Sequence, residues 1–476
     1  MKGPFRTLVI REIQGAIIDF RFWVVFVLCL SIIPLSFYVS VKNYSQRLSD
    51  YQQEVQAYRD NTNIHTEFEA QGVHPPSPLS IFSQGLNNKL PHKVFTSHDG
   101  NFRIEYAKPD NKKDLMGEID FAFIVSFVLS LLAIVFTFSS ISGDKESGVM
   151  RLVLSNPILR RELLLAKLAG NFVIFLVPFL LSMLMALIIV YVSGVIPIFS
   201  EELLLPALIM LGVSILFILV MFNLGLWISA LTQDSILSVN VLLLIWIVLC
   251  LVIPKSSPII SAAIYPVEST GVFESKQALL RQSIVKEKEK EETDLYEKIR
   301  EQVLPGSRGI KSEINEVYDE QAKPLQDKYE KLLAYETERL TNDYSIRCEK
   351  QNRIARSIAC VSPIYIANSL MAEFSNTGYL EVANFTKQAA LYQNSVQQNY
   401  YDKMAVRVYR AKGSTMMTQV NTEDRPPEEL PSFEDYKNAS ISYVFQQNWV
   451  DFALLGFYCL LFFLCSFVSF LRFDVR

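Results

Sequence analysis

The chain has little charge for its length. Asp, Glu, Lys and Arg make up only 20% of its 476 residues, whereas soluble proteins carry about 25%. The formal charge is -4, and no basic face suited to phosphate binding is apparent, so we expect no nucleic-acid partner. The apolar residues, half of the total, gather in six blocks. This uneven distribution excludes a purely soluble enzyme, a disordered chain and a fibrous repeat.

Cysteine is scarce, and its six copies show neither a CxxC motif nor a Cys/His metal spacing. Four of them lie inside apolar blocks, where a thiol behaves as a small hydrophobe. Cys348 and Cys360 lie in a polar stretch instead. One helix carrying both would hold them about 18 Å apart, too far for a disulfide. A chain that folds back between them leaves the pairing open.

All four histidines lie between residues 42 and 120; they are His65, His74, His92 and His98. They are widely spaced, whereas metal ligands usually cluster in the sequence. We therefore interpret them as solvated surface residues and expect no metal ligands, with a metal site among them as the alternative.

Sequence signatures of catalysis are missing. The closest string to a phosphate-binding loop is GSRGIKS at residues 306–312. Its spacing differs from GxxxxGK[ST], and no buried strand precedes it. The GxSxG and HExxH patterns do not occur either. We expect no catalytic residues, no cofactor-binding residues and no ATP hydrolysis by this chain.

The six apolar blocks are long enough to cross a bilayer, which needs about 20 residues in a helix. They cover residues 22–41, 121–141, 171–193, 203–230, 236–253 and 450–471. Charged side chains are absent from their interiors, as expected for segments in lipid. The sequence therefore predicts an all-α polytopic membrane protein with six transmembrane helices.

In the short flanks of the spans, lysine and arginine lie in three places: residues 1–21, residues 142–170 and the tail at 472–476. The short link 194–202 carries neither. Since basic flanks favour the cytoplasm, both termini are predicted to be cytoplasmic. Residues 1–21 have apolar positions at helical spacing and are predicted to form an amphipathic helix in the cytoplasmic interface.

The two long polar stretches then lie outside the cytoplasm. The smaller one, 42–120, combines a polar helix, a proline-rich loop and a hairpin that turns at 98–100, so it is predicted to be mixed α+β. The larger one, 254–449, is predicted to be mainly helical. Helices at 273–304 and 310–358 form a hairpin, which we expect to pack on itself, with a coiled coil to a partner chain as the alternative. A short helix near the membrane surface starts at 361, and another helix covers 380–409.

The most informative segment is the charged link 142–170. It has a short amphipathic core at Val149, Leu152 and Val153, a break at Asn156–Pro157, and a second helix that runs into the third span. Gly148 lets the short helix begin close to a partner surface, and Glu146 and Arg151 offer charged contacts there. A short rigid helix tied to spans on both sides can pass force from a cytoplasmic partner into the membrane.

This segment resembles the coupling region of type-2 ABC transporter permeases, in which Glu-x-Gly, a proline and an arginine run lead to a lysine. The matching positions are Glu146, Gly148, Pro157, Arg160, Arg161 and Lys167; with Arg151 and Leu152 they form the predicted ATPase-coupling site. The six spans and the N-terminal helix also fit that family. The two insertions, with VSPIYIANSL and TGYLEVANF in the larger, resemble the subfamily linked to multicopper-enzyme maturation or gliding motility.

The resemblance implies a permease subunit in the bacterial inner membrane that exports a substrate or handles it at the outer face. It implies cytoplasmic ABC ATPase subunits as partners, which would bind the ATP and Mg, and a second permease chain, identical or paralogous. Membrane lipid and a periplasmic protein are further expected partners. One alternative is a mechanotransmission complex that drives a periplasmic partner while nothing crosses the membrane. The other is a membrane-anchored sensor or scaffold without an ATPase. The sequence does not name the cargo.

Overall fold

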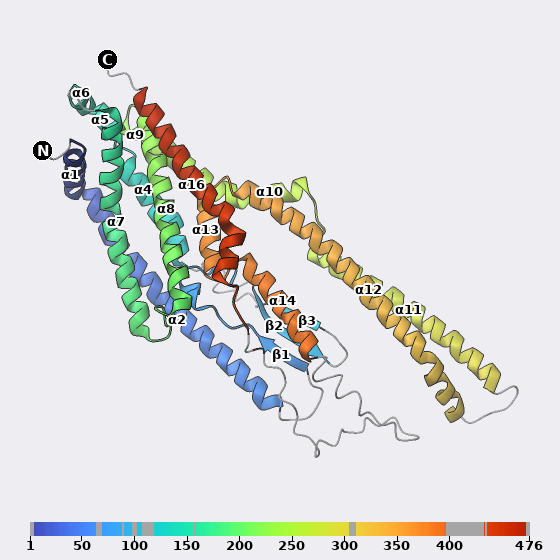
Figure 1. The fold of residues 1–476 in the computed structure, drawn as a ribbon. Helices are drawn as coiled ribbons and strands as arrows, with labels where there is room; N and C mark the ends of the chain where they lie inside the picture. The colour runs from blue at the N-terminus through green and yellow to red at the C-terminus, as the bar shows by residue number, and fades with distance from the viewer. Residues whose placement is uncertain are drawn as a thin grey trace. The chain divides into compact units, whose positions relative to one another are not determined.

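The computed structural model describes residues 4–62, 69–87, 90–97, 102–106, 119–155, 159–303, 311–396, 433 and 436–472. They form two compact units (Figure 1). The second unit holds Lys255–Ala359, and the first holds the other described residues.

Six helices are long and apolar enough to cross a membrane, which confirms the predicted number of spans in the described part of the chain. They are Phe20–Tyr58, Phe121–Glu146, Arg160–Ser193, Glu201–Leu231, Ser235–Ile264 and Ile441–Leu471. Several boundaries differ from the prediction: the second span runs on to Glu146, the third begins at Arg160 and the sixth begins at Ile441. The first span and the polar helix after it are one helix, because no helix-breaking turn lies between their sequences. The fifth helix runs on to Ile264, through Pro254 and Pro258.

The bundle is built from the following elements. They are α1 (Pro4–Ile18), α2 (Phe20–Thr62), α3 (Phe121–Phe123), the π-helix η3 (Ile124–Leu129), α4 (Ser130–Thr137), α7 (Arg160–Ser193), α8 (Glu201–Leu231), α9 (Ser235–Ile247), the π-helix η4 (Val248–Val252) and α16 (Ile441–Leu471). The chain continues from η4 as α10 (Ile253–Ile264), most of which belongs to the second unit. Phenylalanines at 175, 179, 217 and 222 are fully buried where the helices meet. The predicted N-terminal helix is present as α1 and ends just before Asp19, whereas its place in the cytoplasmic interface stays a prediction.

A three-stranded antiparallel sheet lies at the far end of the bundle from α1 (Figure 1). Its strands are β1 (Glu69–Val73), β2 (Pro91–Ser97) and β3 (Phe102–Tyr106). The pairing of Thr96 with Phe102 confirms the predicted hairpin, although its tip at 98–100 lies outside the described residues. Helix α14 (Tyr379–Val396) covers the sheet, with Phe385 and Ala389 packed against Ala70 and Val94. Parts of both polar stretches therefore share one core, and we call β1–β3, α14 and residues 436–440 the sheet module.

The short helix predicted near the membrane surface is α13 (Pro363–Phe374), and it is buried in the main core. Ile366, Leu370 and Met371 have no exposed surface, because α13 packs against both α8 and α16. The apolar residues of α13 thus meet two spans, and its depth relative to the membrane surface stays a prediction. The predicted helix 380–409 is described only to Val396, and its remainder lies outside the described residues.

One histidine prediction was wrong. His74 is only 9% exposed, because its ring lies against Phe385 and its Nε2 atom is 3.2 Å from Glu381 Oε1. His92 is partly exposed and lies 3.2 Å from Glu54. His65 and His98 lie outside the described residues.

The second unit contains the predicted helical hairpin, formed by α11 (Thr270–Val303) and α12 (Lys311–Ala359). The two helices pack on each other: Phe273 stacks on Tyr344, and Tyr296 meets Tyr318 edge-on. This confirms the intrachain packing, with the connecting residues 304–310 outside the described part. Cys348 and Cys360 are both free thiols.

Candidate functional site

The predicted coupling region contains two short helices, α5 (Ser142–Glu146) and α6 (Val149–Leu154), which lead to the start of α7. Gly148 joins them with a φ of 75°. That left-handed conformation favours glycine, since a side chain there would strain the backbone. Nothing lies within 4 Å of the position that a Cβ atom would take. Gly148 is therefore needed for the turn, and its predicted approach to a partner surface stays a prediction.

The buried side of α6 differs from the predicted amphipathic core. Met150 is 1% exposed and fills the contact with α7, whereas Leu152 is 71% exposed and Val149 is 37% exposed. In a helix of only six residues, neighbouring positions point in different directions. Leu152 can therefore be exposed although it is adjacent to Val153. Leu152 thus extends away from the chain's own core. Pro157 lies outside the described residues.

Three consecutive charged residues of α5 hold three different helices. Asp144 pairs with Lys167 of α7 at 2.6 Å. Lys145 donates to the carbonyl oxygens of Ala230 and Thr232 at the end of α8. Glu146 accepts a hydrogen bond from the Ser235 N–H at the start of α9, at 3.2 Å. The last turn of a helix exposes unpaired carbonyls, and the first turn exposes unpaired amides. The positive Lys145 therefore suits the end of α8, and the negative Glu146 suits the start of α9.

Lys167 is the centre of this region. It is 4% exposed, and its Nζ atom lies 2.6 Å from Asp144 and 3.2 Å from Glu12. A buried cation needs paired anions to offset its lost hydration. The triad therefore joins α1, α5 and α7. Glu12 of α1 thus points at α7.

Helix α1 approaches α7 closely at Gly170. A Cβ atom there would lie 2.7 Å from Glu12 Cβ and 3.4 Å from the Val9 carbonyl oxygen. Glycine is therefore the residue that lets Glu12 reach Lys167. Two apolar side chains where α1 meets α2 are exposed: Ile18 at the end of α1 is 83% exposed, and Phe20 at the start of α2 is 78% exposed.

The remaining predicted residues point in different directions. Arg160 donates to the Leu471 carbonyl oxygen at the end of α16, at 2.9 Å. Arg151 and Arg161 are exposed. Lys167 is thus buried and Arg160 is hydrogen-bonded to α16. The remaining three, Arg151, Leu152 and Arg161, lie on the surface.

An open cleft of about 320 Å³ is lined by residues of α1, α6 and α7, among them Arg11, Val153 and Leu163. Arg21 also lines this cleft. Its Nη1 atom donates to Ser139 Oγ, and its guanidinium lies 4.5 Å from the centre of the Phe138 ring. Asn171 donates to Ser140 Oγ at 3.1 Å. These contacts fix the turn before α5 to α2 and α7. The arrangement is suited to transmitting a displacement between helices.

Sequence reasoning missed Glu12, Asp144 and Lys145 as residues of this site. One signal was available for Asp144. Asp144 follows the second span and Lys167 precedes the third, and opposite charges at neighbouring span ends favour an ion pair. No comparable signal identifies Glu12, because its partner is far away in the sequence.

Comparison with protein families gives one result that covers nearly the whole chain. The family described as "ABC-2 family transporter protein" matches residues 6–475. Comparison with curated proteins gives no match. Members of this family are membrane subunits, generally not catalytic, that work with ATPase partners. The chain therefore belongs to the ABC-2 transporter family and is a multi-pass permease subunit of an ABC transporter.

Proposed function

We propose that α5 and α6 receive ATP-driven motion from cytoplasmic ATPase subunits and pass it to the spans. The observation that carries this proposal is the set of contacts made by α5. Asp144, Lys145 and Glu146 bond to α7, α8 and α9, and Lys167 extends the set to α1 through Glu12. A displacement of α5 would therefore move four other helices.

The surface that would meet the ATPase is the exposed side of α6. Leu152 is an exposed apolar side chain, with the exposed Arg151 beside it in the sequence. Exposed apolar residues with a charged rim suit a protein interface. The ATPase subunits would bind ATP and Mg, and this chain would supply the docking surface.

Two substitutions at Leu152 test the docking. Leu152→Pro breaks α6, at about 3 kcal/mol or more in a helix interior, and Leu152→Ser keeps the helix but removes the apolar contact. We expect both variants to insert in the membrane and to lose copurification of the ATPase and stimulated hydrolysis. Lys290→Ala, on the exposed face of the hairpin, is the control. Wild-type behaviour of both Leu152 variants would overturn the assignment.

The membrane orientation follows from the basic residues at the α1 and α5–α7 end of the bundle. We propose that this end and both termini are cytoplasmic, in the bacterial inner membrane, and that the sheet module and the hairpin lie outside. A cysteine at Lys290 should react with an impermeant reagent in intact cells, and one at the exposed Arg161 should not. Labelling at position 161 would contradict this topology.

Export, or handling of a substrate at the outer face, is the favoured transport activity. A mechanotransmission complex is the second candidate, and the long α11–α12 hairpin favours it, since exposed Leu279 and Tyr335 offer contacts to a periplasmic protein. The two activities are separated by what raises ATP hydrolysis of the assembled complex. An added lipid, peptide or lipoprotein supports transport, and an added periplasmic protein supports mechanotransmission.

We propose that a second permease chain packs beside α9, one of two spans with equally little buried surface; the other is α16. Only 17% of the most apolar stretch of the fifth span is buried, against 67% for the second span. Asn240 lies exposed on α9 without a hydrogen-bond partner among the described residues, and such an amide favours pairing across helices over contact with lipid. A cysteine at Asn240 should give a disulfide-linked dimer. A cysteine at the exposed Leu184 of α7 is the control.

A further inference from the structure

Helix α16 is attached to other elements at both of its ends. It runs from Ile441 to Leu471 without a proline, a length of about 46 Å at 1.5 Å per residue. At its end, the Leu471 carbonyl oxygen accepts the Arg160 hydrogen bond at the first residue of α7. That contact lies beside the coupling region.

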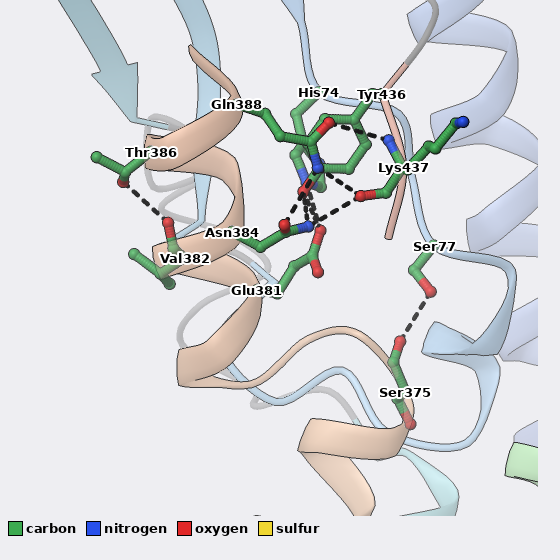
Figure 2. A network of polar contacts seen from close by, with 10 residues as sticks. All are labelled: His74, Ser77, Ser375, Glu381, Val382, Asn384, Thr386, Gln388, Tyr436 and Lys437. Carbon is green, nitrogen blue, oxygen red and sulfur yellow. Dashed lines mark hydrogen bonds and ion pairs between the residues drawn. The ribbon is translucent and has the colours of Figure 1, made fainter. Parts of the chain in front are cut away.

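At its start, α16 is joined to α14 through Lys437, four residues before the helix begins. Three polar residues of α14, spaced by three and four positions, share one face of that helix: Glu381, Asn384 and Gln388 (Figure 2). Asn384 donates to the Lys437 carbonyl oxygen at 3.0 Å, and Gln388 donates to the same atom. The Lys437 N–H donates to Gln388 Oε1 at 3.1 Å. Both backbone groups of Lys437 are thus held by α14.

Glu381 completes this attachment below the surface. It is 2% exposed, and its Oε1 atom accepts a hydrogen bond from the Tyr436 hydroxyl and lies 3.2 Å from His74 Nε2. Burial, and next the Glu381 carboxylate, raise the pKa of Tyr436 well above its ordinary value. The phenol therefore stays protonated and keeps donating. One carboxylate thus joins α14 to the residue after β1 and to the segment that leads into α16 (Figure 2).

We propose that α16 is the mechanical link between the coupling region and the sheet module, and that Glu381 is the positioning residue that fastens its start to α14. This inference rests on the proposed coupling function. A displacement at Arg160 would move α16 along its axis, and the held backbone of Lys437 would carry that motion into α14. Helix α13 packs directly against α8 and α16, so it would respond without Glu381.

The test measures hydrogen exchange in the full chain, assembled in lipid nanodiscs with the ATPase subunit that copurifies with it. Exchange is compared without nucleotide and with ATP plus vanadate, which traps the ATPase. Two variants weaken the attachment: Glu381→Gln, and the pair Asn384→Ala with Gln388→Ala. Thr386→Val is the control, because Thr386 is exposed on α14 and, within the described part of the chain, its hydroxyl bonds only to the Val382 carbonyl of the same helix.

In wild type and in Thr386→Val, we expect the nucleotide to change exchange at 142–155, in α13 and in α14. In both attachment variants, the changes at 142–155 and in α13 should persist, and the change in α14 should be lost. An unaltered response of α14 in both variants would overturn the inference and leave the coupling function standing. No response in any of these segments of wild type would overturn the coupling function and the inference together.

Discussion

The coupling region and the α11–α12 hairpin both contain ion pairs between lysine and acidic residues. These pairs are buried in the coupling region and exposed in the hairpin. In the coupling region, Lys167 is 4% exposed and contacts carboxylates from two other helices. In the hairpin, the Lys328 side chain is 56% exposed and lies 3.1 Å from Glu291. Buried ion pairs are costly to break because the remaining charge has no solvent. Exposed pairs contribute little, since water and salt screen them.

This contrast shows that the number of charges in a segment does not indicate how much those charges stabilise the fold. The hairpin carries the run KEKEKEETD at 286–294, yet its helices are held by buried side chains such as Ile299 and Tyr329. The coupling region has fewer charges, and five of them contact a neighbouring helix: Asp144, Lys145, Glu146, Arg160 and Lys167. Substitutions in the two regions should therefore differ sharply in effect.

The largest effect is expected for Lys167→Met. The variant leaves Glu12 and Asp144 without their cation, and removal of one partner from a buried ion pair costs about 3–5 kcal/mol. We expect a marked fall in the thermal unfolding temperature and faster proteolysis of α1, which loses its charged contact with α7. Both are measured on the purified chain in detergent.

A triple variant shows whether charge is the cause. Glu12→Gln, Asp144→Asn and Lys167→Met together remove every charge of the triad, and neutral replacement of a buried ion pair is often tolerated. The triple variant should regain most of the stability that Lys167→Met loses. Equal instability of the two would show that the triad acts by packing and not by charge.

A smaller effect is expected for Gly170→Val, which tests the close approach of α1. The new Cβ would lie 2.7 Å from Glu12 Cβ, and overpacking of this kind costs about 1–3 kcal/mol. The thermal unfolding temperature should fall. Gly212→Val is the matched control in α8, because nothing lies within 4 Å of the added Cβ atom. Equal losses in the two variants would contradict the assigned contact.

An effect confined to high pH is expected in the hairpin. Burial, followed by the hydrogen bond to Glu291, raises the pKa of Tyr329 from 10.0 to about 12. Because the folded state binds this proton more tightly, the stabilisation is complete below pH 10 and is lost as the pH rises through about 12. The difference in phenolate absorbance between wild type and Tyr329→Phe should therefore show a midpoint near 12. A midpoint near 10 would show that Tyr329 is solvated.

The smallest effect is expected for Lys328→Ala. Its ion pair with Glu291 is exposed on both sides, so we expect no measurable change in hairpin unfolding at physiological salt. Circular dichroism of the purified chain measures this. Destabilisation comparable with that of Lys167→Met would remove the contrast between the two regions.

The sequence predicted the elements that depend on local pattern. The spans, α1, the β2–β3 hairpin and the α11–α12 hairpin follow from run length, periodicity and turn residues, which act within a few residues. Burial of α13 could not be predicted in this way, since it depends on α8 and α16. The same holds for the coupling region: Lys167 was identified from its motif, but its partner Glu12 required the packing of α1 on α7.

Photocrosslinking at Leu152 tests the central claim most directly. A photoreactive amino acid at position 152, and at Lys290 as the control, is placed in the chain, and the membranes are irradiated with the ATPase subunit present. The account predicts an adduct between position 152 and the ATPase whose yield changes with ATP plus vanadate, and no such adduct from position 290. An ATPase adduct from position 290, or none from position 152, would contradict it.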